Sequence, residues 1–123
     1  MKTLLIILVL FITISIYIQP QVKVSKLSEK DAINLLITNL KRDAVYNSWT
    51  KMECLQFYTI EKNEKYFIID IREKHGDGCP GSTITSPRVD TFKILRIKRK
   101  ILWYNLPKDV FESYHKFLKK RKK

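Results

Sequence analysis

The chain has 123 residues, with 24 Lys and Arg against 12 Asp and Glu, which gives a formal net charge of +12. This length accommodates one domain at most and excludes a multidomain enzyme. The positive charge suits an anionic partner. Because the N-terminus predicts export, nucleic acid is not the expected partner, and anionic lipid or a cell-wall polymer is favoured instead.

Residues 1–19 have the pattern of a leader. Lys2 and Thr3 precede LLIILVLFITISIYI, fifteen residues without a charge. A charged start followed by an apolar run of this length is typical of an export signal. We expect either a cleaved signal peptide or an uncleaved anchor that holds the protein to the membrane by residues 4–18. Both alternatives place the rest of the chain in the periplasm or the extracellular space.

The folded domain is expected to begin after a linker at residues 20–27. Ser28 is a good N-cap, and Asp31 three residues later approximates a capping box. Apolar side chains then recur at helical spacing, at Ala32, Ile33, Leu36, Ile37 and Leu40. This pattern predicts an amphipathic helix over residues 29–41.

A different periodicity follows the helix. Segments rich in Phe, Tyr, Ile and Thr predict four strands, at residues 51–61, 66–75, 88–98 and 101–105. The polar turn Lys62–Lys65 is expected to join the first two strands, and the turn Lys98–Lys100 the last two. Trp103 in the fourth strand and Trp49 at the junction of helix and strand are both expected to contribute to the core, with an exposed position as the alternative for Trp49.

Pro107 opens the last predicted element, because proline is favourable near the first position of a helix. Apolar side chains then fall on one helical face, at Val110, Phe111, Tyr114, Phe117 and Leu118. We expect a helix that begins within a single domain of residues 28–115 and runs into a basic tail, residues 116–123. The predicted fold is α+β: an N-terminal helix packed on a four-stranded antiparallel meander, plus a C-terminal amphipathic helix.

Two cysteines in an exported chain predict one disulfide, between Cys54 and Cys79. In the chain-entropy model, closing a loop of about 26 residues contributes about 3.5 kcal/mol. A domain of this size has a total stability of only about 5–15 kcal/mol. The disulfide is therefore expected to matter for folding.

The stretch EKHGDGCPGSTITSPR, residues 73–88, contains all three glycines of the chain. Gly76, Gly78 and Gly81 have the spacing of a dinucleotide-binding fingerprint. That fingerprint requires a helix directly after the glycines, whereas here Pro80 interrupts them and a strand follows. We therefore expect no nucleotide cofactor.

Two other kinds of chemistry could use this stretch. A metal site of His75, Asp77 and Cys79 would need Cys79 as a thiolate, which the predicted disulfide removes. A small hydrolase would need a nucleophile and an orienting group beside His75, chosen from Ser82, Ser86, Asp77 and Asp90. No nucleophile motif such as G-x-S-x-G connects these residues. We expect no metal and no catalytic residue, and the hydrolase stays an alternative.

The simpler interpretation of the loop is conformational. The glycines supply positive φ angles, and Cys79 ties the loop to the first strand. Because the disulfide already restricts the conformations of such a loop, the loop loses less conformational entropy when it binds, so it is well suited to contact a partner. The expected contacts with a protein partner are Ser82, Thr83, Thr85, Ser86 and Arg88, and at the other turn Lys98, Arg99 and Lys100. These two segments flank the third strand at opposite ends, so one partner is expected to use only one of them.

The basic tail has two interpretations. It is either a solvated chain end or a contact with anionic lipid headgroups. The residues expected to make the lipid contact are Lys119, Lys120, Arg121, Lys122 and Lys123.

The segment EKHGDGCPGSTITSPRVDTFKI, followed by ILWY, resembles small exported bacterial proteins. In these a strand, a Cys-containing Gly/Pro loop, a T-x-P-R-x-x-x-F motif and an aromatic hairpin follow one another. Their shape is similar to cystatin-like and PepSY-like domains, and the resemblance covers residues 28–104. It implies a binding or inhibitory role at the cell envelope without catalytic residues.

The function expected from the residues and the resemblance together is a non-catalytic exported binding module. It would act on a protein partner at the cell envelope, as an inhibitor or an immunity protein. The alternatives are a small envelope hydrolase that uses His75, and a membrane-anchored accessory subunit of an envelope complex.

Overall fold

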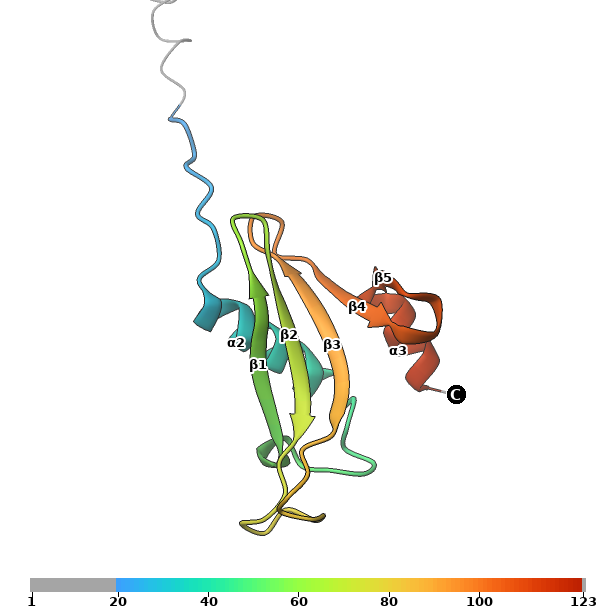
Figure 1. The fold of residues 1–123 in the computed structure, drawn as a ribbon. Helices are drawn as coiled ribbons and strands as arrows, with labels where there is room; N and C mark the ends of the chain where they lie inside the picture. Colours follow the sequence, from blue (N-terminus) through green and yellow to red (C-terminus); the bar gives the residue numbers. More distant parts are fainter. Residues whose placement is uncertain (1–19, 123) are drawn as a thin grey trace, which may run out of the picture.

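The computed structural model describes residues 20–122, so the predictions for residues 1–19 and for Lys123 lie outside the described residues. The helices and strands follow in the order α2 (Glu29–Arg42), β1 (Leu55–Lys62), β2 (Tyr66–Glu73), β3 (Arg88–Leu95), β4 (Ile101–Asn105), β5 (Val110–Ser113) and α3 (Tyr114–Arg121). The strands form one antiparallel sheet in the order β1-β2-β3-β4-β5 (Figure 1). This confirms the prediction of an α+β fold with an N-terminal helix, an antiparallel meander and a C-terminal helix.

Helix α2 begins where the capping pattern predicts. The Ser28 hydroxyl accepts a hydrogen bond from the backbone amide of Asp31 over 3.1 Å and donates one to the Asp31 carboxylate over 2.7 Å. These bonds satisfy groups that a helix start would otherwise leave without partners. The helix buries one face, formed by Ala32, Leu36 and Leu40.

Both helices pack on the same face of the sheet. Figure 1 shows α2 behind strands β1, β2 and β3. The Tyr114 hydroxyl at the start of α3 donates to Asp43, the C-cap of α2, over 2.9 Å. Phe117 of α3 is fully buried, with its ring centroid 5.1 Å from that of Phe92 and 5.4 Å from that of Trp103. The core therefore lies between one face of the sheet and the two helices.

The prediction of one long C-terminal helix from Pro107 is wrong. Leu106–Lys108 is a short 3-10 turn, and Asp109, with a φ of 53°, reverses the chain. Val110–Ser113 then pairs with β4 as a fifth strand, and only from Tyr114 does the chain become helical. The sheet therefore has five strands rather than four.

The other boundaries differ less from the prediction. A 3-10 turn at Met52–Cys54 precedes β1, which shortens the first predicted strand at its start. Strands β2 and β3 end at Glu73 and Leu95, a few residues earlier than the sequence suggests. No helix within residues 20–122 has the length and apolar character that a bilayer crossing requires.

Candidate binding site at the disulfide-linked loop

The predicted disulfide is present. Cys54 ends the 3-10 turn before β1, and it is bonded to Cys79 in the loop after β2, with the two Cα atoms 5.5 Å apart. The backbone amide of Lys74 donates to the carbonyl of Cys54 over 2.8 Å, so a hydrogen bond holds the two segments together as well. Disulfides persist in oxidising compartments, so this bond is typical of an exported protein.

The glycine spacing is explained by a tight two-residue hairpin. Gly76 and Cys79 exchange two backbone hydrogen bonds, of 3.1 and 2.9 Å, around Asp77 and Gly78. Asp77 has a φ of 51° and Gly78 a φ of 83°. Positive φ at both central residues is what an Asp-Gly hairpin turn requires. The positive φ angles predicted for Gly76 and Gly78 are therefore present, and these residues form a tight turn.

His75 anchors the base of the loop, and only 7% of its side chain is exposed. Its Nε2 lies 2.6 Å from the Glu73 carboxylate. Its Nδ1 lies 2.7 Å from the carbonyl oxygen of Ser82 and 3.1 Å from the hydroxyl of Thr85. The ring face is covered by Gly81, where a Cβ atom would sit 2.6 Å from three ring atoms. Only glycine fits at this position without displacing the histidine.

Both ring nitrogens of His75 face hydrogen-bond acceptors, which favours the doubly protonated ring. The carboxylate of Glu73 raises the pKa of His75 above its ordinary value, and the carbonyl of Ser82 adds to the effect. Because a carbonyl oxygen can only accept, Nδ1 must donate to Ser82 and cannot take a proton from Thr85. In the doubly protonated form the ring has no lone pair with which to act as a general base.

Among the described residues, the other hydrolase candidates, Asp77, Ser86 and Asp90, form no hydrogen bond with the His75 ring. Asp77 is exposed and lies 3.3 Å from Lys74. The Ser86 hydroxyl donates to the backbone carbonyl of Glu73 over 2.9 Å. Asp90 is buried elsewhere, on β3, where the hydroxyl of Tyr46 donates to it over 2.7 Å. The metal hypothesis loses a ligand because the sulfur of Cys79 is bonded to Cys54.

The segment Ser82–Arg88 is exposed throughout but well ordered by hydrogen bonds. In addition to the bonds of His75 and Ser86, the Arg72 guanidinium donates to the carbonyl of Ser86 over 3.2 Å. The amide of Glu73 donates to the carbonyl of Pro87 over 3.0 Å. Ile84 stands at the tip of this segment with 90% of its surface exposed. The loop therefore holds a large apolar side chain in solvent.

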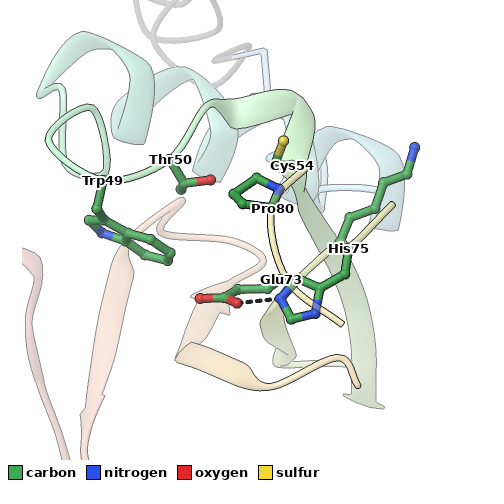
Figure 2. Close-up of a pocket in the computed structure, with 8 residues that line it drawn as sticks. Trp49, Thr50, Cys54, Glu73, His75 and Pro80 are labelled. Atoms are coloured by element: carbon green, nitrogen blue, oxygen red, sulfur yellow. Dashed lines mark hydrogen bonds and ion pairs between the residues drawn. The ribbon is translucent and has the colours of Figure 1, made fainter. Parts of the chain in front are cut away.

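Trp49 is exposed at the same end of the molecule, which corrects its expected place in the core. Its exposed fraction is 44%, and the edge of its ring contacts Tyr46 with the centroids 5.9 Å apart. It lines a hollow of about 290 Å³ with Pro80, Glu73 and His75. Figure 2 shows Trp49 on one side of the Glu73 carboxylate and His75 on the other. Trp103, by contrast, packs against the core as expected.

The sequence interpretation included Ile84 in the expected contact loop without naming it, and it favoured the core over a contact for Trp49. For Ile84 a signal was available, because an isoleucine among Ser, Thr, Gly and Pro belongs to no apolar periodicity. For Trp49 the sequence alone did not decide between the two positions. Both residues are the large apolar groups that a partner would bury first.

The remaining predicted contacts lie elsewhere. Lys98–Lys100 forms the turn between β3 and β4, at the end of β3 opposite the disulfide-linked loop, as expected (Figure 1). In the tail, Arg121 donates to Asp90 over 2.6 Å, and the Lys120 ammonium lies 4.9 Å from the centroid of the Trp103 ring. The other described lysines of the tail are exposed: Lys116, Lys119 and Lys122.

Comparison of this chain with models of known protein families, with curated proteins and with solved structures finds no match. Its function is therefore inferred from the geometry of the site.

Proposed function

We propose that the protein is a non-catalytic exported binding module that docks a protein partner at the cell envelope through the disulfide-linked loop. The observation that carries this proposal is the 90% exposure of Ile84 on a segment whose backbone is fixed. A buried apolar side chain contributes about 1.5–3 kcal/mol relative to an exposed one. A preordered loop realises most of this gain on binding because it loses little conformational entropy.

The surroundings of Ile84 have the composition of a binding surface. Trp49 and Pro80 add apolar surface at the same end of the molecule. Hydroxyl side chains flank Ile84, at Ser82, Thr83, Thr85 and Ser86. An apolar centre with a tryptophan and a polar rim is the usual composition of a protein interface. This end of the molecule is therefore the part that we assign to the partner.

The proposed role is that of an inhibitor or an immunity protein that acts against an enzyme directed at the wall or the membrane. We infer a cystatin-like arrangement for it, supported by the position of α2 across an antiparallel meander (Figure 1). The occupied ring nitrogens of His75 favour this role over the alternative of a small hydrolase. An accessory subunit of an envelope complex is the second form that such a binding module could take.

The test is affinity capture from a detergent extract of the native envelope, with the full chain as bait. We expect a specific partner that is retained by the wild type and lost with Ile84→Asp. The matched control is Ile60→Asp, because Ile60 is 56% exposed on β1, outside the loop. Capture that is equal with Ile84→Asp and with wild type would overturn the assignment of the loop as the docking site.

A further inference from the structure

Arg96 joins three segments at the end of the sheet opposite the disulfide-linked loop. Its amide donates to the carbonyl of Lys65 over 2.9 Å, and its guanidinium donates to the carbonyl of Asn63 over 2.7 Å. Two more bonds connect it to Leu27, where the chain enters the domain: the Leu27 amide donates to the Arg96 carbonyl over 3.0 Å, and Nε donates back over 3.1 Å. The β1–β2 turn, the β3–β4 turn and the entry of the chain are therefore fixed side by side.

This end of the molecule carries uncompensated positive charge. Two of its lysines are paired, since Lys26 contacts Glu64 and Lys62 lies 3.6 Å from Glu29. Four further cations are exposed and form no ion pair within residues 20–122: Lys65, Lys98, Arg99 and Lys100. We call these four residues, together with Ile97, the basic pole.

Two residues of the β3–β4 turn are unfavourable for a segment that only reverses the chain. Ile97 is 52% exposed, although a polar residue would serve in its place. Arg99 has a φ of 52°, which lies in the left-handed region of the backbone. There a Cβ atom clashes with the following carbonyl oxygen, whereas glycine, which has no Cβ atom, adopts the conformation freely. An apolar side chain flanked by cations suits a membrane interface, where it enters between headgroups while the cations contact phosphates.

Residues 20–26, which connect the domain to the N-terminal sequence outside the described residues, enter the domain at this same end. Residues 20–26 are exposed and run past the two turns in Figure 1. Before them the sequence has the fifteen uncharged residues Leu4–Ile18. Seven extended residues span at most about 25 Å. A bilayer that holds residues 4–18 would therefore lie within reach of the basic pole.

We propose that the basic pole is a membrane-docking surface that lies against anionic phospholipid. Lys65, Lys98, Arg99 and Lys100 contact the headgroup phosphates, and Ile97 enters the interface. An anchor at residues 4–18 would bring the bilayer within reach, but the lipid contact does not require it, and the proposal is separate from the docking of a protein by Ile84. Because the two surfaces lie at opposite ends of the sheet, a domain seated on the basic pole presents the disulfide-linked loop away from the membrane (Figure 1).

The basic pole fits this role better than the basic tail. The tail cations Lys116 and Lys120 lie within 3.9 Å of Glu112, and Arg121 is paired with Asp90. Their charge is thus partly compensated within the domain. The cations of the basic pole have no such partner among the described residues.

Hydrogen exchange of the full chain, reconstituted in vesicles of phosphatidylcholine with or without phosphatidylglycerol, tests the proposal. We expect slower exchange of residues 62–66 and 96–101 in the anionic vesicles, and recovery of the faster exchange at high salt. Lys98→Glu/Lys100→Glu should abolish the protection. The matched control is Lys119→Glu/Lys122→Glu, which removes the same charge from the tail and should leave the protection of the basic pole unchanged. Circular dichroism of each variant checks that it is folded.

The possible outcomes separate this proposal from the anchor and from the proposed function. Equal exchange in both vesicles, or protection of residues 116–122 alone, overturns the basic pole as the docking surface. A chain that floats with neither kind of vesicle overturns the proposal together with the anchor. A chain that floats only with anionic vesicles, and only with Lys98 and Lys100 intact, supports the lipid contact without an anchor. None of these results alters the capture experiment with Ile84→Asp.

Discussion

Arg121 in the last helix donates a hydrogen bond to the buried carboxylate of Asp90 over 2.6 Å, although 31 residues separate the two in the sequence. The same carboxylate accepts from the Tyr46 hydroxyl over 2.7 Å and from the Trp103 indole over 3.0 Å. One side chain of β3 is therefore bonded to the connection after α2, to β4 and to α3. Because only 5% of the Asp90 side chain is exposed, water cannot readily replace these three hydrogen-bond donors.

Loss of the Asp90 carboxylate is expected to be strongly destabilising. Asp90→Ala leaves the donors of Tyr46 and Trp103 without partners in a buried site, and it should lower the free energy of unfolding by about 2–4 kcal/mol. Arg121→Ala should cost less, about 1 kcal/mol, because its side chain is 38% exposed and solvent screens the pair. Chemical denaturation measures both changes.

The control for this prediction is Glu53→Ala, because Glu53 is exposed and its side chain forms no ion pair within residues 20–122. A surface substitution of this kind should stay within about 0.5 kcal/mol of the wild type. If Asp90→Ala is no more destabilising than Glu53→Ala, the carboxylate does not hold these elements together.

The disulfide should be detectable and should stabilise the fold. The mass of the intact non-reduced chain is expected to be lower by two hydrogens than that of the reduced chain. Cys54→Ala/Cys79→Ala should lower the free energy of unfolding by about 2–4 kcal/mol, because the unfolded chain regains the freedom that the closed loop removed. Reduction of the wild type should produce a similar loss. Two free thiols in the protein isolated from its native compartment would contradict both the bond and the exported location.

The contribution of His75 to stability should depend on pH. Its pKa is raised in the folded state, mainly by Glu73, above the value of about 6.5 that a histidine has in an unfolded chain. A raised pKa means that the folded state binds the proton more tightly, so the contribution is full below about pH 6.5 and is lost as the pH rises through the folded value. The difference in stability between wild type and His75→Gln should therefore shrink as the pH increases above 6.5.

Nuclear magnetic resonance of the His75 ring gives an independent measurement of this prediction. Its titration midpoint should lie above that of a histidine in an unstructured peptide, and Glu73→Gln should bring it down. A midpoint at or below the peptide value would show that the ring is not held as a cation. His75 would then be a candidate base again, and the hydrolase alternative would regain support.

The sequence was sufficient for the elements whose signals are local. Ser28 and Asp31 determine where α2 begins, and alternating apolar residues determine β1 and β2. The disulfide followed from the presence of only two cysteines in a chain with a leader. Each of these patterns has one satisfactory physical solution, so it could be interpreted without knowledge of the tertiary contacts.

The C-terminal segment had two satisfactory solutions, and the sequence did not choose between them. Val110 and Phe111 fit a helical face with Tyr114, but they also fit a short strand. Tertiary contacts decide for the strand, because Phe111 pairs with Tyr104 across β4 and β5, with ring centroids 5.2 Å apart. Ser113 then caps α3 by accepting from the amide of Lys116 over 3.3 Å. Such contacts depend on where β4 lies, which no local pattern encodes.

The network of His75 was unpredictable for a similar reason. The sequence identified His75 and Ser82 as chemically interesting, but not that the backbone carbonyl of Ser82, rather than its hydroxyl, would face the ring. That single difference weakens the alternative of a hydrolase, because a ring nitrogen that donates to a carbonyl oxygen cannot at the same time accept a proton from a hydroxyl. The path of the loop decides it, and the loop is set by the disulfide and by Gly81.

Arg99→Gly should increase stability and weaken membrane association at the same time. Glycine adopts the φ of 52° without the steric cost of a Cβ atom, so we expect a net gain of about 0.5–1 kcal/mol after the greater entropy of the unfolded chain is taken into account. The same change removes one cation from the basic pole and should reduce the hydrogen-exchange protection of residues 62–66 and 96–101 in anionic vesicles. Lys98→Gly is the matched control, because residue 98 is not among the residues with positive φ; it removes the same charge but should destabilise the fold. Denaturation midpoints and hydrogen exchange in vesicles measure the two effects separately. If Arg99→Gly proves less stable than the wild type, the arginine contributes to folding, and its strained conformation is no longer an argument for a lipid contact.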